Sequence, residues 1–221
     1  MTAHRLARIA FGTLLLFGVP ALAETPDSLQ WKDLIPEARI SENPIKRLSP
    51  DRWTEFEEVF WVRTLDPEAR QHVVPEILAN AEIFERELRG EGVDIDTMIA
   101  DYAAWKTAVE RRGSVLVDSL DGKPIRMPGY LLPLNFSPDG QNEFLLVPYL
   151  GACIHVPPPP PNQIVFVQTA EPFVVRGLYT PVWVTGQMST RSSTRALFFV
   201  DGTADIDVGY ALRVEDIQPY E

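Results

Sequence analysis

The first half of the chain repeats its hydrophobic residues with the period of an α-helix. One helix is predicted to begin at Ser49, a favourable N-cap residue that is followed by proline at the first helical position. A second helix follows Pro75, and a third covers about 96–112. The apolar faces of the three helices are formed by Trp53, Phe56 and Phe60, by Ile77, Ala81, Phe84 and Leu88, and by Ile99, Tyr102 and Val109. Residues 49–113 are therefore predicted to be a helical segment.

After Gly113 the pattern changes to short strands separated by turn residues. The Asp121-Gly122 pair has β-branched residues on both sides and predicts a hairpin turn. Further strands are predicted over 143–150, 163–170, 172–190, 195–200 and 210–217. The stretch "VWVTG" followed by "YALRVEDIQPY" resembles the closing strands of an OB-type barrel. The predicted fold class is α+β, with a helical segment followed by a small antiparallel β-barrel (OB-like) domain over 114–221.

Residues 1–23 have the features of a secretory signal peptide. Two arginines precede an apolar run, and the small residues of "ALA" predict cleavage before Glu24. The apolar run is short for a membrane span, which needs about 20 residues, and no second candidate follows it. The sequence therefore predicts an exported protein, periplasmic or secreted, that is soluble once processed. Residues 24–48 mix prolines with charges and are predicted to form an extended arm with Trp31 as its aromatic anchor.

The charge balance narrows the range of partners. The chain has 31 acidic and 20 basic residues, a formal net charge of −11. Loss of the two arginines within 1–23 leaves 31 acids against 18 bases, which gives −13. Such a surface repels nucleic acid and has no basic patch for anionic lipid. Cations and basic partners are the favoured ligands, and nucleic acid is not expected to bind.

The stretch "GACIHVPPPPPNQ" at 151–163 holds the candidate chemistry. Cys153 is the only cysteine and forms no internal disulfide, and His155 follows two residues later, before five consecutive prolines. On a strand the two side chains would share one face, about 6.7 Å apart at Cα, and a thiolate with an imidazole suits Zn²⁺ or Cu(I). The prolines would form a rigid polyproline II rod that holds the pair in place. Cys153 and His155 are therefore the predicted metal ligands.

Two other interpretations of this pair stay open. Cys153 is equally well a small buried residue with His155 as its hydrogen-bonded neighbour, because lone cysteines usually pack in the interior. His155 could instead activate Cys153 as a nucleophile, but residues two apart on a strand point in parallel rather than at each other. Spacing does not determine the remaining metal ligands, for which His72, Asp201 and Asp205 are candidates. These residues favour a non-catalytic protein over an enzyme.

The proline run also supports a different class of function. Proline-rich segments are common docking elements, because they lose little conformational entropy on binding. The alternative function is thus a non-catalytic protein-interaction module in which Cys153 and His155 are structural.

Two polar stretches near the end of the chain are weaker candidates. The loop around 189–194 carries Arg191 and Arg195 and is interpreted as a polar hairpin loop, although its arginines could meet an anion. The alternating acids of 201–207 are interpreted as a turn. They are not taken as a calcium loop, because the position of the bidentate glutamate is occupied by Leu212.

Several stretches resemble a known family. "PGYLLPL", "EFLLVPYLGACIHVPPPPPNQIVFV" and "PVWVTGQM", within 125–188, are similar to the DUF3299 family of bacterial exported proteins, whose function is unassigned. "WKDLIP" at 31–36 resembles the arm near the start of such proteins. The resemblance implies the barrel core and the exported location. It also implies a link to metal handling and a partner that is an inner-membrane ABC-type transporter or another exported protein.

Overall fold

The computed structural model describes residues 25–135, 137, 139–153, 158–175, 177–199 and 202–220. The predicted signal segment, His155 and Asp201 lie outside the described residues. Helices come first along the chain and strands follow, with only the two-residue strand β1 (Asp27–Ser28) before the helices. The predicted α+β fold class is confirmed.

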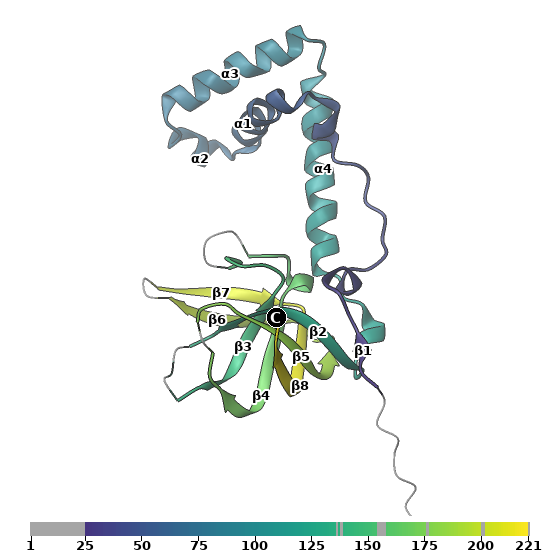
Figure 1. Ribbon diagram of the computed structural model, residues 1–221. Coiled ribbons are helices and arrows are strands. Elements are labelled where there is room, and N and C mark those ends of the chain that lie inside the picture. Colours follow the sequence, from purple (N-terminus) through teal and green to yellow (C-terminus); the bar gives the residue numbers. More distant parts are fainter. Residues whose placement is uncertain are drawn as a thin grey trace, which may run out of the picture.

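The first part of the described chain is built from four α-helices. They are α1 (Trp53–Thr64), α2 (Pro67–Gln71), α3 (Pro75–Gly90) and α4 (Ile95–Ser114), with the short 3-10 helices η1 (Trp31–Leu34), η2 (Pro44–Arg47) and η3 (Pro50–Arg52) before them. Figure 1 shows α4 projecting from the strands, with α1 to α3 gathered at its far end. Asp94 caps α4, because its carboxylate accepts the N–H of Thr97 at 3.2 Å.

The predicted apolar faces are buried where helices pack against each other and are exposed where they have no neighbour. On α3, Ala81 and Leu88 are buried as predicted. On α4, burial in the helical cluster is confined to the first half, at Ile95, Met98 and Tyr102, and Val109 is 40% exposed. Val109 was wrongly assigned to a buried face. It lies on the stretch of α4 between the helical cluster and the barrel, where the helix period continues without a packing partner.

Five strands close into a barrel in the order β2-β3-β4-β8-β5 and back to β2. The strands after the helices are β2 (Pro124–Pro133), β3 (Gln141–Val147), β4 (Val165–Phe173), β5 (Thr180–Ser189), β6 (Ser193–Phe199), β7 (Gly202–Val208) and β8 (Tyr210–Pro219). The OB-like barrel is confirmed, but it is not purely antiparallel, because β4 and β8 pair in parallel. β8 lies between β4 and β5, which run in opposite directions, so it must be parallel to one of them.

The hairpin predicted at Asp121-Gly122 is wrong. Between α4 and these residues, all of which the structure describes, there is no strand, and the chain forms the 3-10 helix η4 (Asp118–Leu120) instead. The β-branched side chain of Val117 packs against the barrel interior, while its N–H is bonded to the hydroxyl of Tyr210 at 2.8 Å. That bond satisfies the backbone without a partner strand. The interpretation of the acidic stretch 201–207 as a turn is also wrong, because Gly202–Val208 forms the strand β7, which pairs with β6.

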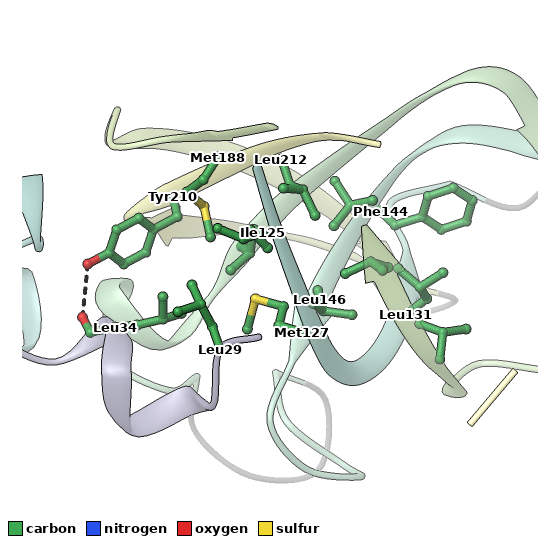
Figure 2. Packing of buried hydrophobic residues seen from close by; sticks show 14 of the residues in the cluster. Leu29, Leu34, Ile125, Met127, Leu131, Phe144, Leu146, Met188, Tyr210 and Leu212 are labelled. Atoms are coloured by element: carbon green, nitrogen blue, oxygen red, sulfur yellow. Dashed lines mark hydrogen bonds between the residues drawn. The ribbon is translucent and has the colours of Figure 1, made fainter. Parts of the chain in front are cut away.

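The second half of β3 (144–147) and the first three residues of β4 (165–167) are buried on both faces. Phe144, Leu146 and Val167 point into the barrel interior, which Figure 2 shows packed with leucine, methionine and aromatic side chains. Their neighbours Leu145 and Phe166 point outward into a second buried group that also contains residues of the β6–β7 hairpin. We call this second group the outer cluster; it comprises Leu132, Leu134, Leu145, Val147, Ala152, Cys153, Ile164, Phe166, Leu197, Ile206 and Val208. Burial on both faces explains the unbroken apolar runs of β3 and β4.

We predict that Tyr210→Phe lowers the free energy of unfolding by about 2–4 kcal/mol, because two buried backbone groups lose their partner. The hydroxyl of Tyr210 donates to the carbonyl of Leu34 at 2.9 Å, drawn in Figure 2, and accepts the N–H of Val117. Urea unfolding measures the change. Tyr220→Phe is the control, since Tyr220 is 50% exposed, and it should change stability by less than about 0.5 kcal/mol. Equal stability of the two variants would contradict this account.

Candidate functional site

Cys153 lies in a turn after β3 and not on a strand. Its backbone has φ of +69°, in the left-handed region that residues other than glycine seldom occupy. The parallel alignment with His155 that a strand would impose therefore does not apply. His155 itself is outside the described residues, so its place beside the thiol stays a prediction.

The thiol of Cys153 belongs to the outer cluster. Its residue is 7% exposed, and burial raises the pKa of the thiol to about 11. The neighbouring Tyr179 donates its hydroxyl to the carbonyl of Ala152 at 2.7 Å. Burial, together with the nearby charge of an ionised Cys153, raises the pKa of Tyr179 to about 12. Burial among the described residues therefore favours the protonated form of both groups at neutral pH, and the role of Cys153 as a metal ligand stays a prediction.

The other predicted ligands do not assemble around Cys153 in the part of the chain that is described. His72 ends α2 and is exposed, and Asp205 is exposed on β7. The described residues contain no group of three or more His, Cys, Asp or Glu side chains able to hold a metal ion. Asn162 and Gln163, which follow the proline run, donate hydrogen bonds to the backbone of other segments.

These two amides build a junction at η5 (Pro161–Gln163), the end of the proline run. Asn162 is 1% exposed, and its amide donates to the carbonyls of Arg112 at 2.8 Å and Val115 at 3.0 Å, at the end of α4. Gln163 donates to the carbonyl of Trp31 at 3.0 Å. One short segment therefore joins the last turn of α4 and the arm to the start of β4.

The prolines before the junction pack against other elements. Pro159 is buried, and a Cβ on Gly113 would lie 2.6 Å from the Cβ of Pro160. On the other side, the N–H of Gly209 donates to the carbonyl of Pro161 at 2.7 Å. Contacts of Pro160 and Pro161 thus link the end of the run to the last turn of α4 and to Gly209. This internal role leaves less of the run available for docking than the sequence suggested.

An open pocket of about 170 Å³ lies where the arm crosses the barrel. Its lining is made of aromatic residues, prolines and one glycine: Trp31, Pro128, Gly129, Tyr130, Pro148, Pro181 and Tyr220. We call it the aromatic pocket. A Cβ on Gly129 would lie 2.7 Å from the Cγ of Leu146 and 3.0 Å from Cζ2 of Trp31, so the glycine lets the indole lie directly on β2.

The walls of the aromatic pocket are held by strand pairing. Tyr130 on β2 lies opposite Pro181 on β5, and the N–H of Tyr220 donates to the carbonyl of Pro181 at 3.2 Å. Among the residues that the structure describes, no charged side chain lines the pocket. The arrangement offers flat ring faces for apolar contact.

The sequence predicted a role for Trp31, one wall of this pocket, but gave no indication of the other lining residues. Trp31 was expected to anchor the arm, and it does pack against the barrel interior. Tyr130 and Tyr220 carried no local signal, because they lie 90 residues apart and come to one pocket only when β5 pairs with both β2 and β8. Tyr149, which follows the pocket residue Pro148 in the chain, is 44% exposed.

Comparison with known proteins identifies relatives of unassigned function. The chain matches the DUF3299 family model, described as a protein of unknown function, over residues 31–219. It is similar to a crystal structure of a DUF3299 family protein from Pseudomonas aeruginosa PAO1, with 28% identity, a TM-score of 0.47, and coverage of 90% of this chain and 98% of that one. No curated protein matches the chain. In the described residues, no helix has both the length and the apolar character needed to cross a membrane.

We predict that Cys153 reacts slowly with a thiol reagent such as Ellman's reagent at pH 8. A free thiol ionises near pH 8.5, whereas a pKa of about 11 leaves much less thiolate at that pH. The rate should keep rising up to pH 11 in the folded protein and become fast in denaturant. The assay contains EDTA, so a bound metal cannot protect the thiol. Reaction as fast in the folded as in the unfolded protein would show that the thiol is exposed and ionised.

We predict that Gly113→Ala destabilises the protein by about 1–3 kcal/mol, because the new methyl group collides with Pro160. Gly90→Ala is the matched control. Gly90 also lies in a helix, and a Cβ added there would have nothing within 4 Å, so alanine should be neutral or stabilising by up to about 1 kcal/mol. Thermal or urea unfolding compares the two. A neutral Gly113→Ala would mean that the proline run is free to move away from α4.

Proposed function

This chain belongs to the DUF3299 family, and we propose that it works as a non-catalytic protein-interaction module outside the cytoplasm. The observation that carries the proposal is the aromatic pocket. Its occupant is an extended, proline-containing segment of another exported protein or of an inner-membrane transporter. The signal-like pattern of residues 1–23 supports the compartment.

The chemistry of the pocket suits such a segment. Polyproline II peptides dock into grooves lined by aromatic side chains, and they lose little entropy because they are already extended. Trp31, Tyr130 and Tyr220 supply aromatic rings, and a described lining without charge avoids the cost of desolvating an ion. Tyr149 and Leu150, exposed by 44% and 67%, extend the apolar surface beside the pocket.

The pocket is also prepared for binding before a partner arrives. Trp31 is held through its carbonyl by Gln163 and is supported by Gly129 against its ring. Tyr130 and Pro181 are part of paired strands. A binding surface whose side chains are already ordered loses less entropy on association, so modest contact area gives useful affinity.

Binding of Zn²⁺ or Cu(I) by Cys153 and His155 is the competing proposal. A metal ion at Cys153 would have to displace a proton from a thiol whose pKa is about 11, among apolar side chains. Burial of Cys153 therefore favours the structural role. Zinc titration under reducing conditions separates the two proposals, because Cys153→Ser should leave zinc affinity unchanged if the thiol is structural.

We predict that a fluorescently labelled peptide of ten prolines binds saturably and weakly, with a Kd of about 10–1000 μM, as expected for a few apolar contacts. Tyr220→Ala should weaken binding at least about fivefold, because Tyr220 lines the pocket and is 50% exposed. Fluorescence anisotropy measures both.

Phe198→Ala is the matched control. Phe198 is an aromatic residue of β6 that is 49% exposed and does not line the pocket, so its loss should leave peptide affinity unchanged. Absence of saturation at millimolar peptide, or equal weakening by both substitutions, would refute the proposed function.

A further inference from the structure

Four arginines of the barrel have no carboxylate partner in the described structure, a feature that they share with Arg86 and Arg111 on the helices. On the helical side, Arg47, Arg52, Arg63 and Arg89 form salt bridges with acidic side chains. On the barrel, Arg126, Arg191, Arg195 and Arg213 have no carboxylate within salt-bridge distance among the described residues, although acids outnumber bases by 31 to 20 in the chain. Two of these four, Arg191 and Arg213, line one groove, and Arg195 packs on Phe166, another residue of its lining.

The groove has a volume of about 540 Å³ and lies over the outer faces of β4, β8 and β5. The register of the strands places the side chains of its floor in two rows. One row crosses the three strands as Gln168, Arg213 and Gln187. The other crosses them as Phe166, Ala211 and Ser189. Because alanine is the smallest of these side chains, the space of the groove opens above Ala211.

Arginine side chains surround this space. Arg213 donates to Oε1 of Gln187 at 2.6 Å, which orients its guanidinium while leaving other N–H groups unused. Arg195 reaches across from β6, and its Cζ lies 3.8 Å from the ring centre of Phe166. The Nε of Arg195 is buried and has no hydrogen-bond partner in the described structure. Arg191 completes the rim after β5.

One acidic residue, Asp121, also lines the groove. Its Oδ1 accepts the N–H of Thr190 at 2.9 Å, so the carboxylate is engaged in holding the loop before β6. Counting Arg195, which stacks on the groove residue Phe166, three guanidinium groups face one carboxylate. Around this groove positive side chains therefore outnumber negative ones, on a protein whose net charge is negative.

We propose that this groove binds a small molecule with a multiply charged oxyanion group, either a phosphate ester or a polycarboxylate. Guanidinium groups present paired N–H donors that match the oxygens of both anions. An acceptor over Ala211 would meet the unused donors of Arg213 on one side and the arginines of the β5–β6 side on the other. The volume falls within the range of ligand sites, about 300–1000 Å³. A long polyanion such as nucleic acid would be repelled by the rest of the surface.

The test uses pyrophosphate and citrate as probes for the two anion classes, with calorimetric titration of the full chain at low ionic strength. At least one of the two should bind saturably, and the one that binds tighter identifies the class. Arg213→Gln and Arg191→Gln should each weaken binding about tenfold, as expected for loss of a charge-assisted hydrogen bond. Ala211→Leu should weaken it as strongly without any change in charge, because leucine fills the groove.

Arg126→Gln is the control for the loss of one positive charge. Arg126 also lacks a carboxylate partner in the described structure and stacks on an aromatic ring, that of Trp183 at 4.2 Å, but it does not line the groove. Its substitution should change affinity less than about twofold. Lack of saturable binding by both anions, or equal weakening by Arg126→Gln and Arg213→Gln, would overturn the proposal. Circular dichroism verifies that each variant is folded.

Discussion

The arrangement of the helical segment, the arm and the barrel depends on the hydrogen bonds of the Asn162 side-chain amide. It bonds two carbonyls at the end of α4, where a helix leaves its last carbonyl groups without partners. Asn162 is 1% exposed, and its neighbour Gln163 donates to the carbonyl of Trp31. The stiff prolines before it limit how the segment can move. The direction of α4, the path of the arm and one wall of the aromatic pocket therefore follow from a single short segment.

Burial on both faces of 144–147 in β3 and 165–167 in β4 is the second constraint. Their outward side chains need a cover, and the β6–β7 hairpin supplies one through Leu197 and Ile206. The same cover buries Cys153 and places Arg195 over Phe166. The environment of the cysteine and the shape of the basic groove are thus consequences of how the barrel wall is covered.

The two proposed binding surfaces lie at opposite ends of β5 and β8. Pro181 and Tyr220 belong to the aromatic pocket, whereas Gln187 and Arg213 belong to the groove. One surface is lined by rings, and the other is lined by arginine. Their separation along the strands lets one substitution test one surface, because side chains this far apart with no shared partner contribute almost independently.

Local pattern in the sequence determined the element types, and only the closed tertiary structure decided the sites. The helical period of Ala81 and Leu88 and the unbroken apolar run of β3 each depend on nearby residues, so they are visible in the chain. Val117 has the side chain of a strand residue, but its hydrogen bond with Tyr210, 93 positions away, replaces strand pairing. The surroundings of Cys153 come from several strands at once, and so do the aromatic pocket and the two rows that meet at Ala211. Such contacts between distant segments follow from register and barrel closure, which no local pattern specifies.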